Sequence, residues 1–244
     1  MLRESLQTCL SAMLAAGMLL NCGRAADPGN PEAEQAQDER RAMSAELEQK
    51  RQARLQELGA MSVAELVAEL HSEATRGVEP FNSMSFAEMV SRGETGASAL
   101  KSELESGERA SYLALLALRA MSPKDYDELD PALRTALLVD ALASAETMNA
   151  WGLPNQYWED AAKALIAEGS AASQALRPLL DDCRPAPLWG SEEVLASREY
   201  GYRLCDYAWA LMLEIAGDQT EIPADPLERD RMLAKLKDPT REQN

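Results

Sequence analysis

Three stretches of the chain share one pattern: GETGASALKSEL at 93–104, PALRTALLVDAL at 131–142 and GSAASQALRPLL at 169–180. Each opens on a residue that interrupts helices (Gly93, Pro131 or Gly169), and successive openings lie 38 residues apart. Leucines follow at the same two positions of every stretch: Leu100 and Leu104, Leu138 and Leu142, Leu176 and Leu180. Residues four apart share one face of an α-helix, so each stretch predicts a helix that buries its leucine pair.

The sequence around these stretches is also typical of helices. Residues that favour helix, above all Ala, Leu and Glu, outnumber β-branched and aromatic residues, and no window alternates like a strand. Helix starts are predicted where a capping side chain precedes a suitable first turn, at Ser62, Ser85, Ser122, Asp130 and Asp225. Helix ends are predicted at Gly77, Gly93, Gly169 and Gly217. The predicted fold class is all-α.

The repeated unit, a helix, a breaker and a second helix, resembles HEAT-type helical repeats over about residues 85–217. The resemblance implies a short right-handed α-solenoid, in which stacked helical hairpins bury a continuous core. An irregular helical bundle with fortuitous spacing is the alternative. In the third repeated unit, Pro178 should kink the second helix or delay its start. After Gly190 the period is lost, and one longer helix from Glu192 to Ala216 is expected to replace a hairpin.

The N-terminus predicts export. Arg3 precedes a mostly apolar stretch from Cys9 to Leu20, too short to span a bilayer but suited to a signal-peptide core. The sequence around Cys22 resembles the lipobox of bacterial lipoproteins, although Asn21 departs from that pattern, and Ala25 permits ordinary cleavage instead. We therefore expect a signal peptide at 1–22, a flexible tether at 23–31, a polar helical linker at 32–58 and the helical domain at 59–244. The expected location is the periplasm, or the membrane through a lipid on Cys22.

Two cysteines, Cys183 and Cys205, remain in the predicted mature domain. An exported protein can form disulfides, so this pair could be bonded, and two separate buried thiols are the alternative. The chain has no C-x-x-C and a single histidine, His71, which predicts neither a metal site nor a cofactor. His71 lies beside an apolar helix stripe and is expected to be a partly buried structural residue.

The formal net charge is −17, and no stripe of basic residues occurs. Nucleic acid and anionic lipid head groups are therefore not expected as partners. None of the common hydrolase, nucleotide-binding or metalloprotease motifs occurs, so no catalytic residue is assigned and the chain is not expected to be an enzyme. The catalytic alternative is an envelope enzyme, such as a glycan hydrolase, that uses the carboxylates of Asp181, Asp182, Glu192 and Glu193.

Aromatic residues gather late in the chain, with eight of the twelve between Trp151 and Trp209. Trp and Tyr beside Arg are typical of binding hot spots, although the core of a terminal repeat needs the same residues. Arg203 and Asp206, three apart on one helix, are expected to pair. The candidate binding residues are Trp151, Trp158, Trp189, Tyr200, Arg203 and Asp206. The sequence thus predicts a non-catalytic interaction or scaffold protein whose partner is another envelope protein, with a small-ligand binder as a further alternative.

Overall fold

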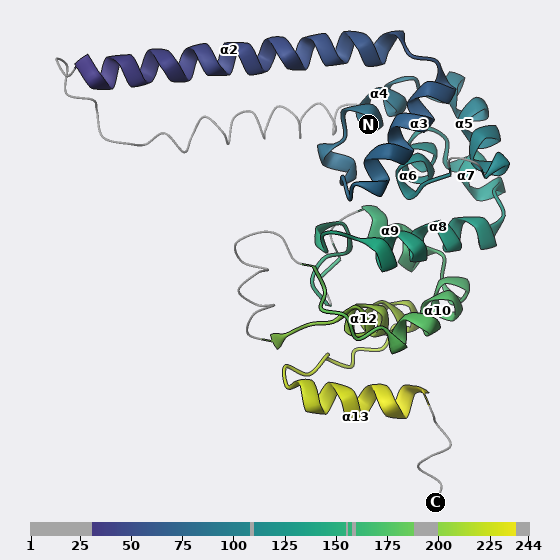
Figure 1. The fold of residues 1–244 in the computed structure, drawn as a ribbon. Coiled ribbons are helices and arrows are strands. Elements are labelled where there is room, and N and C mark those ends of the chain that lie inside the picture. Colours follow the sequence, from purple (N-terminus) through teal and green to yellow (C-terminus); the bar gives the residue numbers. More distant parts are fainter. Residues whose placement is uncertain (1–30, 108–109, 155, 158–159, 188–199, 238–244) are drawn as a thin grey trace, which may run out of the picture. The chain divides into compact units, whose positions relative to one another are not determined.

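A computed structural model describes residues 31–107, 110–154, 156–157, 160–187 and 200–237, and the chain divides into two units, Met1–Arg54 and Leu55–Asn244. The described part consists of α-helices and short 3-10 helices (Figure 1). In these residues there are two isolated β-bridges and no strand. The prediction of an all-α fold is confirmed. The predicted signal peptide, Cys9 and Cys22 lie outside the described residues.

Helix α2 (Pro31–Ala60) contains all of the described residues of the first unit and ends within the second unit. Its described side chains up to Arg54 are almost all exposed, and even Met43 and Leu47 are 60% accessible. Pairs one turn apart, such as Lys50–Glu46 at 2.7 Å, stabilise such a helix only slightly. Neither α2 nor any other described helix is both long enough and apolar enough to cross a membrane.

The second unit is built around α6 (Tyr112–Met121), whose first seven residues, Tyr112 to Leu118, are all buried. Helices that precede α6 in the sequence and helices that follow it both contact it. They are α3 (Val63–Thr75), α4 (Met84–Ser91), α5 (Glu94–Ser106), α7 (Pro123–Glu128), α8 (Pro131–Ser144) and α9 (Asp160–Ala167). A helix that is hydrophobic all round must be enclosed, so α6 fixes where the surrounding helices pack.

The C-terminal part of the same unit packs around a second buried helix, α12 (Leu204–Ala216). Its partners are α9, α10 (Ser170–Leu176) and the 3-10 helix η3 (Arg177–Asp181). The last described helix is α13 (Pro226–Lys237), and two further 3-10 turns are η1 (Pro80–Asn82) and η2 (Asn149–Trp151).

All six leucines of the repeated pattern are at most 2% accessible. Gly93 and Gly169 both take positive φ and stand at the N-cap of the helix that follows, α5 and α10, while Pro131 opens α8. Pro178 marks the change from α10 to the tighter η3, as its missing N–H predicts. These positions repeat as expected, whereas their stacking as HEAT-like hairpins stays a proposal.

The predicted caps were right at four of five starts. Ser62 forms a reciprocal capping box with Glu65, and Ser122, Asp130 and Asp225 each accept a backbone N–H of the first turn. The prediction for Ser85 was wrong, because Ser83 caps α4 by accepting from Phe86 N. The hydroxyls of Ser83 and Ser85 both donate to the buried Glu73 of α3. Contacts with another helix therefore decide where α4 begins.

The long helix predicted from Glu192 to Ala216 is wrong at residues 201–203. Gly201 has a φ of +57°, Arg203 forms an antiparallel bridge with Pro185, and α12 begins only at Leu204. The bridge holds the chain extended, because Ala186 N donates to Tyr202 O and Leu204 N donates to Arg184 O. Residues 192–199 lie outside the described part.

A buried ion pair joins α8 to the turn after α9. Arg134 Nε and one terminal nitrogen donate to the two carboxylate oxygens of Glu168 at 2.9 and 3.0 Å, and both side chains are largely enclosed. The Tyr126 hydroxyl also donates to Glu168 at 2.6 Å. Burial and this negatively charged neighbour raise the pKa of Tyr126, so the phenol remains a donor at neutral pH.

Replacing Glu168 by Ala should lower the free energy of unfolding by about 3 kcal/mol, because Arg134 would keep its buried charge without a counter-ion. Urea denaturation monitored by circular dichroism measures the loss. Glu128→Ala is the matched control, since it removes the half-exposed partner of Lys101 and should cost far less. Equal losses in the two variants would contradict the structural role of the buried pair.

Gly152 should tolerate no side chain. Its φ is +68°, and a Cβ atom there would lie 1.8 Å from the carbonyl oxygen of Gln156. Gly152→Ala should therefore cost at least about 2 kcal/mol. Gly59→Ala, at a helical position with nothing within 4 Å of the added atom, should be neutral or stabilising in the same denaturation experiment.

Candidate functional site

A cavity of about 100 Å³ opens in the second unit where α3, α6 and α8 come together with η2. Three segments of the chain line it: the end of α3 with the turn after it, residues 110–112, and the last turns of α8 together with residues 145–151 that follow them. The residues that give it its chemistry are His71, Glu79, Tyr112, Asp140, Glu146 and Trp151.

Gly77 allows the walls of this cavity to meet. It follows the end of α3 with a φ of +66°, and a Cβ atom there would lie only 2.9 Å from Cβ of Glu146. The segment after α8 therefore packs directly against the backbone of the turn after α3. This close approach holds the exposed Glu146 at the cavity, beside residues more than sixty positions earlier in the chain.

The floor of the cavity is aromatic and buried. Trp151 is 1% accessible and Tyr112 is 9% accessible, and the Tyr112 hydroxyl donates to Val78 O at 2.8 Å. Burial, and secondly the negative charge of the buried Glu79, raise the pKa of Tyr112. His71, half-buried as expected, places Nδ1 3.4 Å from Ala110 O.

The charge of the cavity is one-sided. Glu79 is buried within it, while Asp140 and Glu146 are exposed. Among the described lining residues none is lysine or arginine, so His71 is the one basic side chain there. Three carboxylates around a partly enclosed space produce a negative potential that solvent screens less than on an open surface.

The size of the cavity limits its ligand. Sites for drug-sized molecules usually enclose roughly 300–1,000 Å³, whereas a cavity of about 150 Å³ holds a benzene ring. The observed 100 Å³ therefore suits one small group, such as the end of a single side chain. A carboxylate-lined aromatic wall favours a positively charged group over a neutral one.

The four described candidate binding residues from the sequence are not all brought to this cavity. Trp151 lines the cavity, whereas Tyr200, Arg203 and Asp206 do not. Trp158 and Trp189 lie outside the described residues. The Tyr200 ring lies 5.8 Å from that of Tyr202, and the nearby Tyr207 and Trp209 are core residues.

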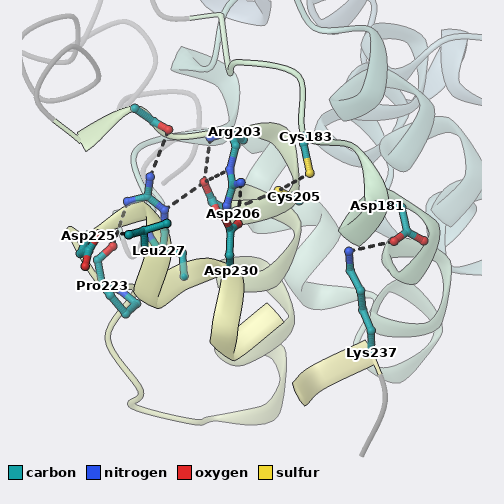
Figure 2. A network of polar contacts seen from close by, with 12 residues as sticks. Asp181, Cys183, Arg203, Cys205, Asp206, Pro223, Asp225, Leu227, Asp230 and Lys237 are labelled. Atoms are coloured by element: carbon teal, nitrogen blue, oxygen red, sulfur yellow. Dashed lines mark hydrogen bonds and ion pairs between the residues drawn. The ribbon is translucent and has the colours of Figure 1, made fainter. Parts of the chain in front are cut away.

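Arg203 and Asp206 belong to a buried ionic network (Figure 2). Their predicted pairing is confirmed at 3.1 Å, and Arg203 also reaches Asp230 of α13 at 2.7 Å. Arg229, fully buried on α13, contacts Asp206 at 3.2 Å and donates to the carbonyls of Pro223, Ala224 and Gly201. Its guanidinium also lies 5.0 Å from the centre of the Tyr202 ring. The network joins α13 to α12, and Asp206 is enclosed by protein partners.

The two described carboxylates among those suggested for glycan hydrolysis are engaged in ion pairs. Lys237 contacts Asp181 at 2.8 Å, and Arg184 donates to both oxygens of Asp182. The hydrogen bond from Arg184 lowers the pKa of Asp182, whereas a general acid needs a raised pKa. Glu192 and Glu193 lie outside the described residues. Across the described ranges, no group of three or more His, Cys, Asp or Glu side chains is arranged to hold a metal ion.

Sequence reasoning missed most of the cavity, because its residues share no local motif. Glu79, Tyr112, Asp140 and Glu146 come from three different segments and meet only through helix packing. Two signals pointed toward it: His71 as the single histidine, and Trp151 as a candidate binding residue.

Asp206→Asn should lower the free energy of unfolding by about 3 kcal/mol, because the neutral amide would leave Arg229 as a buried charge without a counter-ion. The matched control is Asp230→Asn, which alters an exposed partner of the same network and should cost much less. Urea denaturation measures both, and a larger loss for the Asp230 variant would refute the central position of Asp206.

In comparisons with known proteins, no family model, no curated protein and no solved structure matches this chain.

Proposed function

We propose that this chain is an exported, non-catalytic protein that binds another protein of the bacterial envelope, and that its acidic cavity receives a lysine or arginine side chain of that partner. The observation that carries the binding proposal is the cavity itself. It combines the carboxylates of Asp140 and Glu146, both exposed, with the buried Glu79, Trp151 and Tyr112.

The charge of the whole chain supports a cationic partner. The formal net charge is −17, so a basic partner would be attracted from a distance before it docks. Asp140 and Glu146 are exposed at the cavity and would meet the incoming side chain first, whereas Glu79 is buried. Such an arrangement accelerates association and selects against acidic partners.

The architecture and location belong to the same proposal. A short HEAT-like solenoid would present an extended surface around the cavity, and the regular burial of the leucine pairs supports that arrangement. An irregular helical bundle would leave the cavity unchanged. Export is supported by the apolar N-terminal stretch after Arg3, with lipid attachment at Cys22 as one route to the membrane.

His71 provides a direct test of the cavity, because the chain has one histidine and its ring signals in a proton NMR spectrum overlap with no other imidazole. Titrating the untagged full chain with acetyl-Gly-Lys-Gly-amide should shift these signals in a saturable way, with a Kd of about 1 mM for so small a ligand. The same peptide with norleucine in place of lysine keeps the aliphatic stem without the charge and should leave the signals unmoved. Equal shifts with the lysine and norleucine peptides would refute the cationic site. So would the absence of any shift with the lysine peptide and with the same peptide carrying arginine in place of lysine.

Charge reversal at the cavity should weaken binding in the same titration. Asp140→Lys combined with Glu146→Lys should raise the Kd of the lysine peptide at least about tenfold at low salt, and less at high salt. Glu105→Lys is the control, since it reverses one charge, rather than two, at an exposed position of α5 outside the cavity and should leave the Kd nearly unchanged.

Crosslinked capture from an envelope extract tests the larger claim. The full chain and its Glu105→Lys variant should retain a stoichiometric protein that the double variant loses. Binding of the lysine peptide without any such protein would preserve the cavity as a cation site and refute the protein partner.

A further inference from the structure

Two thiols meet where the chain leaves η3 and where α12 begins. Sγ of Cys205 lies 4.0 Å from Sγ of Cys183, although the residues are 22 positions apart (Figure 2). Both are free thiols in the structure. This placement is independent of the acidic cavity, which neither residue lines.

Backbone hydrogen bonds hold the two residues together on both sides of the thiols. Cys205 N donates to Asp182 O at 2.9 Å, and Leu204 N donates to Arg184 O at 3.0 Å. The bridge between Pro185 and Arg203 continues this pairing. The sulfurs therefore need to approach by only about 2 Å to reach the 2.05 Å of a disulfide, a movement within reach of side-chain rotation.

The two thiols differ in access. Cys183 is exposed, whereas Cys205 is fully buried within α12. Burial, and secondly the neighbouring Asp206 carboxylate, raise the pKa of Cys205 to about 12. The thiolate is the attacking species in disulfide exchange, so reaction with an external disulfide should begin at Cys183.

From this geometry we infer that Cys183 and Cys205 are a disulfide-forming pair, in which the exposed Cys183 accepts oxidation and the buried Cys205 completes the bond. In the first step the Cys183 thiolate attacks the disulfide of an oxidised dithiol protein or of glutathione, and one thiolate leaves. In the second step Cys205 loses its proton to water and attacks the Cys183 sulfur, which expels the second thiolate. The pair loses two electrons and two protons, and the oxidant is reduced to two thiols.

The bond would fasten α12 to the end of η3. It would close a 22-residue separation beside Asp206, where the ionic network joins α12 to α13. A disulfide reduces the conformational entropy of the unfolded chain and thereby stabilises the folded state. For residues 22 positions apart, the thermal midpoint of unfolding should rise by about 5–10 °C.

Peptide mapping of the full chain after equilibration with oxidised and reduced glutathione tests the inference. Trypsin does not cut before proline, so Cys183 falls in peptide 164–198, Cys205 in 204–229, and both Cys9 and Cys22 in 4–24. The expected product is a crosslink between 164–198 and 204–229, with the higher thermal midpoint. Oxidised protein that carries only glutathione on Cys183, or a crosslinked protein with a lower midpoint, would overturn the inference.

Single variants test the order of the two steps. Cys205→Ser should accumulate a glutathione adduct at residue 183, because no second thiol resolves it. Cys183→Ser should leave Cys205 at least about tenfold less modified under the same conditions, since that thiol is buried. Equal modification in the two variants would contradict the assignment of Cys183 as the entry point.

Discussion

The burial of α6 is the constraint on which most of the second unit depends. Its leucines 113, 115, 116 and 118 face different directions around the helix, yet none is more than 3% accessible. Each is worth roughly 2 kcal/mol when removed from water, so the chain gains most by surrounding this helix completely. Helices α3, α4 and α5 cover it from one side in sequence, and α7, α8 and α9 from the other. The cavity lies where this enclosure is incomplete, beside Tyr112 at the start of α6.

Apolar burial alone would allow these helices to slide along one another, and buried ion pairs oppose that. Arg134 and Glu168 connect α8 with the turn after α9, while Asp206 and Arg229 connect α12 with α13. A buried charge tolerates little displacement from its partner, since each lost contact leaves it desolvated without compensation. The two thiols lie beside the second of these networks, so a disulfide there would add a covalent link to an interface that ionic contacts already fix.

How far the sequence predicts the structure depends on the range of the interactions involved. The caps at Ser62, Ser122 and Asp130 were predictable, because the donor and acceptor lie within one turn. The leucine pairs were predictable through their spacing. The start of α4 was not, because Glu73 from another helix engages Ser83 and Ser85. The start of α12 was missed for a related reason. Residues 202–204 lie beside residues 184–186, and the strand-like hydrogen bonds made by Tyr202 O and Leu204 N outweigh the helical preference of the segment.

The use of arginine connects the buried networks to the proposed binding function. Arg134, Arg203 and Arg229 are mostly or fully enclosed, and each spends its positive charge on a carboxylate inside the protein. Such side chains contribute little to the potential outside, whereas Asp140 and Glu146 stand exposed at the cavity without a lysine or arginine in its described lining. Because these arginines are neutralised by carboxylates within the protein, the formal net charge of −17 remains on the other residues. A fold that keeps arginines in its interior and carboxylates at a small aromatic cavity is physically suited to take up a cation from outside.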